Sequence, residues 1–459
     1  MLIAVWIITI AVIVGIGIYS GTKVKSADEW SGGDRSMSAA KIGFMYCAYM
    51  IGGTAVVGAA QDGYNIGISG FWYGPCSAFF LLFMAAIAKL ICTKMKGVTV
   101  PAYLDSRYDK KTSRVYTVTF LVNAFLYIPL QLITVSSIIK IAIPNLNMNL
   151  ALFVGLLIAV LYTGFSGIRG ASSVGTIASI GIYVLLVGFV TVTLISFGGF
   201  SAVLSEVPPE YSSPLNIKLQ KIVAWCIGGC LSTAVKQTVI QPILSAKNPA
   251  TAQRGAVLGY IFAAPLTLFT AFCGIFAAAS GVDLGNGSTA FAWTIKQFSS
   301  PWFAGIIFAF ATMIIAATMS TMMLATGTIL TNLYKTDINP QASDSMTLKM
   351  SKILTFVFSF VSLIPALLLP SDSITSMFLT IQHVSGAPAS FAILGGMLWK
   401  KCSSQGAFWS MLSGVTVGVL WMVLGLTSYV EALYPTVLVT YVVGILVSLA
   451  TYKKEGLAG

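Results

Sequence analysis

The sequence predicts an all-α integral membrane protein, and three observations support this fold class. Hydrophobic residues make up 57% of the 459 residues and charged residues only 9%, whereas a typical soluble chain has about 25% charged residues. The mean hydropathy is +0.88. About thirteen apolar segments are long enough to cross a bilayer as helices. Two of these segments carry paired glycines near their centres, which weaken a helix where lipid most requires intact hydrogen bonds.

The apolar segments follow one another along the whole chain, with short loops between them. We expect spans at residues 2–20, 39–60, 66–93, 115–139, 149–166, 174–198, 219–243, 255–280, 302–331, 351–369, 374–399, 405–427 and 433–451. The first segment has neither a basic start nor a small-residue cleavage site, so we expect it to remain as a span.

The basic residues predict the orientation of the chain, because Lys and Arg prefer cytoplasmic loops. With the N-terminus outside, the cytoplasmic loops and the C-terminal tail contain most of the 26 basic residues. Four are left for the outer side: Lys140, Lys218, Lys221 and Lys296. We therefore expect an integral protein of the plasma (cytoplasmic) membrane. Its N-terminus should lie outside the cell and its C-terminus in the cytoplasm.

Paired glycines interrupt the second and the seventh span. Ile51-Gly52-Gly53 recurs as Ile227-Gly228-Gly229. Each glycine costs about 1 kcal/mol against alanine in a helix interior, and a break in lipid requires that the freed backbone groups face protein or a wet cavity. The alternative is that the glycines let another helix pack closely. Matching breaks in two halves favour an inverted repeat with its binding site between the breaks.

Spans two to six and seven to eleven then form two five-helix units of opposite topology. We expect a peripheral first span and cytoplasmic loop at 1–38, a first inverted repeat at 39–198, an external loop at 199–218, a second inverted repeat at 219–401, and two accessory spans with a short tail at 402–459.

The ionisable residues disfavour proton coupling. None of the 14 acidic residues lies in the middle of a span, and Asp62, at an outer end, is the nearest. An intramembrane carboxylate is the usual proton relay. The single histidine, His383, lies in span eleven, and we interpret it as a satisfied packing residue rather than a relay. The seven cysteines lack metal-binding spacing, and no nucleophile–base set is present, so we do not expect an enzyme.

Neutral oxygens can bind a cation instead. Ala317, Ser320 and Thr321 are spaced i, i+3, i+4 in span nine and share one helix face. Two hydroxyls and a carbonyl on this face, with carbonyls freed near the break of span two, would offer five oxygen ligands to a small, hard cation. The alternative is that the hydroxyls bond back to their own helix.

Short motifs in a consistent order resemble those of the sodium/solute symporter family, which includes the sodium/glucose, sodium/proline and sodium/sialic acid symporters. The resemblance extends from about residue 31 to residue 401. The matching motifs are Gly58 with Gly63-Tyr64-Asn65-Ile66-Gly67; Thr99-Val100-Pro101-Ala102-Tyr103-Leu104 with Arg107; Gln237-Thr238-Val239-Ile240-Gln241 with Ala246-Lys247 and Ala252-Gln253-Arg254; Ala317 to Thr321 with Asn332-Leu333-Tyr334; and Gly396 to Trp399-Lys400-Lys401.

The resemblance implies a LeuT-like 5+5 inverted-repeat core and Na+ as the coupling ion. It implies a sodium site made of the backbone oxygens of Ala48, Ile51 and Ala317 and the hydroxyls of Ser320 and Thr321. Members with a second sodium site carry an acid and serines where this chain has Gly175 and Met322-Met323, so we expect one Na+ per cycle. Lys236 replaces a usual asparagine, and we expect its side chain to snorkel to the cytoplasm rather than to pair inside.

We expect the solute between Gly52-Gly53 and Gly228-Gly229, where the N-termini of half helices favour an anionic group. Further candidate contacts are Thr54, Ser232 and Gln382. The polar residues of sugar-binding members are missing at Ala55 and Gly229.

The expected function is therefore sodium-coupled import of a small carboxylate or amino acid by alternating access. The alternatives are a proton-coupled symporter that uses His383, and a transport-inactive solute sensor. The expected partners are a small-molecule solute and the lipid bilayer, and no nucleic acid.

Overall fold

Helices make up the regular secondary structure of the described part of the chain, as the sequence predicts. The structure is a computed structural model that describes residues 1–21, 35–95, 99–367 and 374–455. Some helical side chains are also outside the description: those of residues 20–21, 162, 164–172, 376 and 453–455. Within these ranges no strand is present, and an isolated bridge joins Met37 to Ala246.

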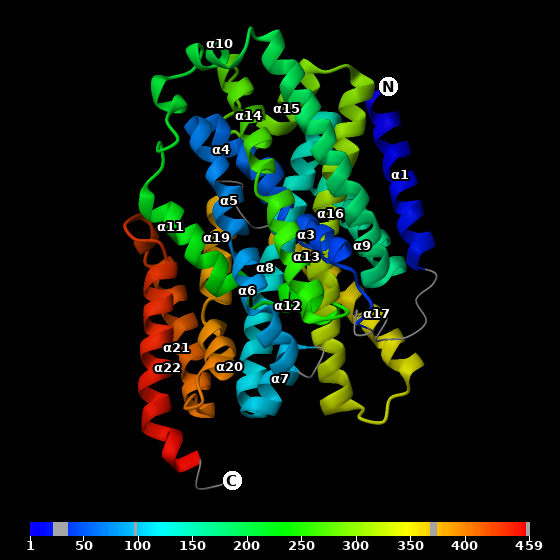
Figure 1. Cartoon of the computed structure of the whole chain (residues 1–459). Coiled ribbons are helices and arrows are strands. Elements are labelled where there is room, and N and C mark those ends of the chain that lie inside the picture. Colours follow the sequence, from blue (N-terminus) through cyan, green and yellow to red (C-terminus); the bar gives the residue numbers. More distant parts are fainter. Residues whose placement is uncertain (22–34, 96–98, 368–373, 456–459) are drawn as a thin grey trace.

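The first half of the chain, coloured from blue to green in Figure 1, includes the first broken span. Its helices are α1 (Leu2–Gly21), α3 (Ala39–Met50), the π-helix η1 (Thr54–Gly58), α4 (Ala59–Ile66), the 3₁₀-helix η2 (Gly67–Trp72), α5 (Tyr73–Ala78), α6 (Phe80–Lys94), α7 (Val100–Arg107), α8 (Lys110–Ala142), α9 (Met148–Ser196), α10 (Phe200–Ser205) and the 3₁₀-helix η3 (Pro209–Ser212). Side chains cap several of these helices. The Asp109 carboxylate, for example, accepts a hydrogen bond from the Thr112 amide at 2.7 Å and so begins α8.

The second half of the chain includes two more interrupted spans. Its helices are α11 (Leu219–Gly228), the π-helix η4 (Gly229–Thr233), α12 (Gln237–Leu244), α13 (Pro249–Ala263), α14 (Leu266–Ala279), α15 (Ala290–Phe298), α16 (Pro301–Leu333), the π-helix η5 (Tyr334–Ile338), α17 (Asp344–Val361), α18 (Leu363–Ala366), α19 (Ile374–Gly386), the π-helix η6 (Phe391–Gly395), α20 (Gly396–Leu398), α21 (Ser404–Val423), the 3₁₀-helix η7 (Leu426–Ser428) and α22 (Leu433–Glu455). Pro249 and Pro301 each occupy a first helical position, where proline costs no hydrogen bond.

In the described ranges, nine helices are long and apolar enough to cross a bilayer, or up to eleven if each of two bent pairs is one span. The sequence predicts thirteen spans, and two features explain the difference. α9 is continuous from Met148 to Ser196 and contains two predicted spans, the first of which, 149–166, extends into residues whose side chains lie outside the description. The break after Met50 leaves α3 with 12 residues. Thirteen spans therefore remain a prediction.

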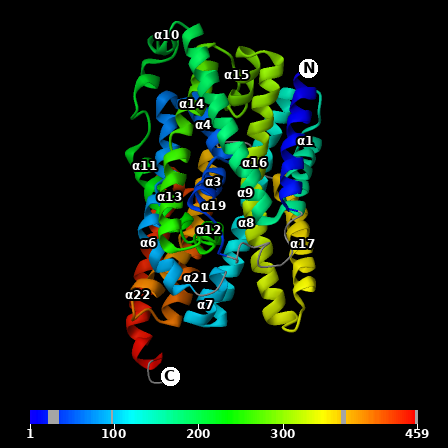
Figure 2. The same ribbon diagram turned by 45° about the vertical axis from the view of Figure 1, so that its right-hand side comes forward.

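The two ends of the chain lie at opposite ends of the bundle in both views (Figures 1 and 2). An odd number of membrane crossings requires this arrangement. α1 lies at one side of the bundle, against α9 and α16, whereas α21 and α22 lie together at the other side.

α16 is the most enclosed long helix of the described bundle, and most of its residues from Ala304 to Thr331 are buried. Its many small residues allow neighbouring helices to pack closely, as is typical of membrane bundles. The Trp6 indole donates to Thr312 Oγ1 at 3.3 Å and so holds α1 against α16. α16 thus provides a firm support for the broken span that packs on it.

Candidate functional site

The second predicted span is broken where the sequence predicts. α3 ends at Met50, and Ile51 leaves the helix with φ −84° and ψ 52°. In a regular α-helix the Ala55 amide would donate to the Ile51 carbonyl, but here it donates to the Gly52 carbonyl at 3.1 Å. The Ile51 carbonyl has thus lost its helical donor and is available to another ligand.

The seventh predicted span is also broken, but after Thr233 rather than at the paired glycines. The helix continues through Gly228 and Gly229 into η4, and the chain bends by 63° between η4 and α12. A Cβ atom at Gly228 would collide with His383, and one at Gly229 would lie 3.0 Å from the Ser77 carbonyl oxygen. These glycines therefore permit close packing, and the prediction that they form the break is wrong.

One side of α8 satisfies backbone groups at both breaks. Gln131 Oε1 accepts a hydrogen bond from the Gly53 amide at 2.7 Å. The Tyr116 hydroxyl accepts from the Gln237 amide at 3.1 Å and donates to the Val235 carbonyl at 3.2 Å. Backbone groups that a break frees inside a membrane need such partners. α8 therefore stabilises both interrupted helices.

The two segments that contain the predicted sodium ligands pack against each other at Thr318. Thr318 Oγ1 donates to the Ala48 carbonyl at 2.7 Å, and a Cβ atom at Gly52 would lie 2.9 Å from Thr318 Cγ2. The structure thus brings the break next to the segment of α16 that contains Ala317. The sequence interpretation did not include Thr318, although it lies between predicted ligands.

The two predicted hydroxyl ligands differ in their surroundings. Ser320 is fully buried, and in the described structure its Oγ has no hydrogen-bond partner. Thr321 Oγ1 donates to the Ala317 carbonyl at 2.9 Å, which is the bond within the same helix that the sequence left as an alternative. A hydroxyl that donates keeps lone pairs for a cation. Both oxygens are therefore suitable ligands, and Ser320 is the one without a competing bond.

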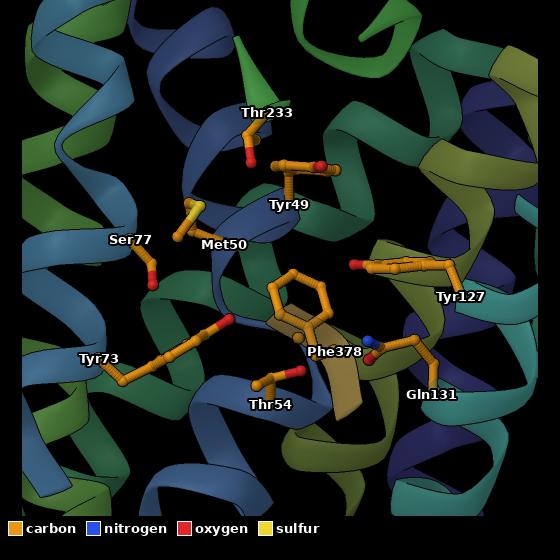
Figure 3. Close-up of a pocket in the computed structure, with 10 residues that line it drawn as sticks. Tyr49, Met50, Thr54, Tyr73, Ser77, Tyr127, Gln131, Thr233 and Phe378 are labelled. Carbon is orange, nitrogen blue, oxygen red and sulfur yellow. The ribbon is translucent and has the colours of Figure 1, made fainter. Parts of the chain in front are cut away.

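A small cavity lies beside the first break, where residues from five parts of the chain converge (Figure 3). Its lining consists of Tyr49, Met50, Gly52, Thr54, Tyr73, Ser77, Tyr127, Gln131, Thr233 and Phe378. Its volume of about 20 Å³ has room for about one water molecule. The Phe378 ring lies between Tyr73 and Tyr127, with centroid distances of 6.2 and 5.6 Å. This ring therefore keeps the cavity small.

Polar atoms around the cavity are buried without partners in the part of the chain that the structure describes. They are Tyr49 OH, Thr54 Oγ1, Ser77 Oγ and Gln131 Nε2. Buried polar groups in proteins are normally hydrogen-bonded, so this cluster is unusual. The four groups include donors and acceptors, and they fit a site that binds a small polar molecule.

The structure places the predicted solute contacts in different surroundings. Gly52 and Thr54 line the cavity, and Gly53 lies between them with its amide bound to Gln131. Ser232, by contrast, donates to the Gly228 carbonyl of its own helix and is buried. Together with the packing of Gly228 and Gly229, this puts the predicted contacts from the seventh span outside the lining.

Gln382 lies near the cavity but not in its lining, at 3.4 Å from Asn123. The sequence interpretation missed most of the lining, including Tyr127 and Gln131 of α8. One signal was present: polar residues recur at helical spacing along this apolar span, at Tyr116, Asn123, Tyr127 and Gln131.

Two ionisable residues differ from their predicted surroundings. Lys236 is only 3% exposed, and its Nζ donates to Asn123 Oδ1 at 3.1 Å. The prediction that it snorkels to the cytoplasm is therefore wrong, because its ammonium group is buried against Asn123. His383 is buried, and neither ring nitrogen has a partner among the described residues. It is therefore not the satisfied packing residue that the sequence interpretation expected.

Comparison with known proteins places these features in a family. The sequence profile described as "Sodium:solute symporter family" matches residues 31–414. The chain is similar to a sodium/glucose cotransporter of Vibrio parahaemolyticus, with 24% identity over 98% of this chain and 90% of the relative. It is also similar to a monocarboxylate transport permease protein of Rhizobium johnstonii, with 22% identity over 78% of this chain and 74% of the relative.

A solved structure of a Na+-coupled sialic acid symporter, substrate-bound and open to the outside, has the same fold. Its TM-score is 0.83 over 97% of both chains, at 15% sequence identity. The family consists of multi-pass membrane transporters rather than enzymes, which agrees with the long apolar helices. Because the family profile matches most of the chain, this protein belongs to the sodium:solute symporter family.

Proposed function

We propose that the protein imports a small carboxylate or amino acid together with one Na+ per cycle, by alternating access. The observation that carries this proposal is the buried, unpartnered Ser320 hydroxyl on the helix that supports the first broken span. Membership of the family and the similarity to a sodium/glucose cotransporter support coupling to sodium.

The proposed sodium ligands come from both sides of one helix contact. Ala48 and Ile51 contribute carbonyl oxygens from the broken span. The oxygens from α16 belong to Ala317, Ser320 and Thr321. Sodium on this set favours the state in which α3 and α16 are in contact. When the two helices separate, the ligands move apart and the affinity for sodium falls.

The surroundings of Gly175 support a stoichiometry of one sodium. A Cβ atom at this position would lie 2.9 Å from the Ala48 Cβ, so a carboxylate side chain has no room there without a shift of α3. Met322 and Met323 are buried and provide no oxygen. The chain therefore lacks the acid and the serines that a second sodium site of this family would use.

The solute is proposed to bind at the cavity beside the first break. The unpartnered groups there, such as Tyr49 OH and Gln131 Nε2, can donate to a carboxylate. The similarity to a monocarboxylate permease agrees with this class of solute, whereas Ala55 and Gly229 leave no polar side chain for a sugar at their positions. Binding requires that Phe378 move, because the cavity is too small for an organic solute.

The proposal is tested by thermal unfolding of the purified protein in sodium and in choline buffers. Sodium at ten times its Kd is expected to stabilise the protein by about 1.4 kcal/mol. The double variant Ser320→Ala, Thr321→Ala should lose this stabilisation.

The matched control is Thr328→Ala, two turns further along α16. Thr328 is also buried, and its hydroxyl donates to the Leu324 carbonyl of the same helix at 2.8 Å. The control should keep the sodium effect. A sodium effect that survives in the double variant would reject the proposed site.

One observation supports a second candidate, proton coupling. Both ring nitrogens of His383 are buried without a described partner, so this side chain could carry a proton between states. Proton coupling predicts uptake driven by a pH gradient in sodium-free buffer, and its loss in His383→Gln. Uptake that requires sodium and is unchanged in this variant would exclude it.

A further inference from the structure

We propose that the Lys236 ammonium group binds the carboxylate of the solute, and that Asn123 is its positioning residue. This inference rests on the proposed function and names the chemical group that the solute must carry. It starts from a buried ammonium group whose hydrogen bond in the described structure goes to a neutral amide, Asn123 Oδ1, at 3.1 Å.

The surroundings of Lys236 lie about one helical turn beyond the cavity on α8 and α19, and Lys236 itself lies in the break of the seventh span. On its own segment, it follows the lining residue Thr233 by three positions. Its partner Asn123 precedes the lining residue Tyr127 by four positions on α8. Gln382, which Asn123 contacts at 3.4 Å, follows Phe378 on α19 by four positions. Since one turn of a helix rises about 5.4 Å, α8 and α19 place Asn123 and Gln382 about one turn from the solute cavity, and the ammonium group lies there with its partner Asn123.

No carboxylate neutralises this ammonium group in the described ranges. An ion pair of the described structure, Arg114 with Asp337 at 3.1 Å, lies at the surface and does not involve Lys236. Burying an unpaired charge costs several kcal/mol, and a neutral amide cannot supply the missing negative charge. The charge of the Lys236 ammonium group is therefore balanced only when an anion binds next to it.

The unpartnered groups near Lys236 can all donate hydrogen bonds. The Tyr49 hydroxyl lies beside Thr238 and Gln382. Tyr49 OH, Thr238 Oγ1 and Gln382 Nε2 are buried close to one another, and none of them makes a hydrogen bond of regular geometry in the described structure. Several directional donors around one positive charge fit the two oxygens of a carboxylate, which accepts several hydrogen bonds. A halide ion would leave most of these directions unused.

The orientation of Asn123 is fixed by its other bonds. Its Nδ2 donates to Ser385 Oγ at 2.6 Å and contacts Gln382 Oε1 at 3.4 Å, so Oδ1 is directed at Lys236. Gly386 leaves room for the lysine, because a Cβ atom there would lie 3.1 Å from Lys236 Cε. The lysine is therefore held in place by α8 and α19 rather than by a counter-ion.

The test uses thermal unfolding of the full-length protein in sodium buffer. The ligands are propionate, L-lactate and L-proline, each compared with its amide. At least one of the three acids is expected to raise the Tm of the unsubstituted protein, and its amide is not. In Lys236→Gln the affinity for that acid should fall by about 30-fold or more, as for the loss of one partner of a buried charge pair.

Two further variants make the result specific. Lys218→Gln changes the same charge at an exposed position and should leave the shift intact. Asn123→Asp supplies a carboxylate to Lys236 from within the protein and should abolish acid binding, because the ammonium group is then already paired. Without ligand, Lys236→Gln should unfold at the same or a higher temperature, since it removes an uncompensated buried charge.

Three results would overturn this inference: none of the acids shifts the Tm, the amides bind as tightly as the acids, or the shift persists in Lys236→Gln. The sodium effect is measured in the same samples. If it remains in Lys236→Gln, the variant is folded and the proposed sodium coupling stands independently of the carboxylate subsite. If it is missing in the unsubstituted protein, the sodium proposal fails, whereas the acid-dependent shift still reports on Lys236.

Discussion

At the scale of single residues, the site depends on Gly53, which allows the first break to lie close to α8. Gly53 has φ −56° and ψ −34°, a conformation that alanine adopts equally well. Its Cβ atom would, however, collide with the Thr134 side chain of α8. Gly53 is therefore required for the close approach of the break to α8, and not for backbone freedom.

Gly53→Ala is accordingly expected to destabilise the protein by about 1–3 kcal/mol, the usual cost of overpacking, and to weaken sodium binding because the break shifts. Gly188→Ala is the matched control, since its added Cβ would meet no atom of another helix within 4 Å. The control should be neutral or up to about 1 kcal/mol more stable. Thermal unfolding with and without sodium measures both, and similar losses in the two variants would contradict this account.

At the scale of helices, α8 is the element that links the two halves of the site. Gln131 binds the backbone of the first break, and Tyr116 binds that of the second. Tyr127 lies between them and lines the cavity. α8 is therefore hydrogen-bonded to the backbone of both broken helices.

Tyr116→Phe should destabilise the second break, because the Val235 carbonyl and the Gln237 amide lose their hydrogen bonds to the Tyr116 hydroxyl. Each buried polar group left without a partner costs about 1–3 kcal/mol. Hydrogen exchange of residues 234–240 should become faster in this variant. Tyr434→Phe loses a hydroxyl bond to the exposed Gln220 carbonyl and should leave the exchange unchanged; equal protection in both variants would show that Tyr116 does not hold the break.

The same comparison of helices explains which parts of the site could be predicted from the sequence. The first break and the hydroxyl face of α16 depend on local spacing, so they could be predicted. The second glycine pair has the same local pattern, yet the structure uses it for packing against His383. The partner of Lys236 is Asn123, 113 residues away in sequence, and no local pattern could identify it.

At the scale of the whole molecule, the opposite positions of the two termini agree with an odd number of crossings. The predicted orientation assigns Leu215 to the outer side and Ile338 to the cytoplasmic side. Both side chains are accessible, with 65% and 73% exposure, so cysteines at these positions can react.

In intact cells, a membrane-impermeant maleimide should therefore label Leu215→Cys. It should label Ile338→Cys only after permeabilisation. The unsubstituted protein, with its seven cysteines, provides the background. The reverse pattern would show that the chain is inserted with the opposite orientation.

The position of Phe378 between two tyrosines has a pharmacological consequence. If the solute binds in this cavity as proposed, it can enter only after the Phe378 ring rotates away, because the cavity admits about one water molecule. A rigid compound that blocks the rotation of the Phe378 ring is expected to inhibit transport without resembling the solute. Removal of the ring in Phe378→Ala should make the protein resistant to such an inhibitor.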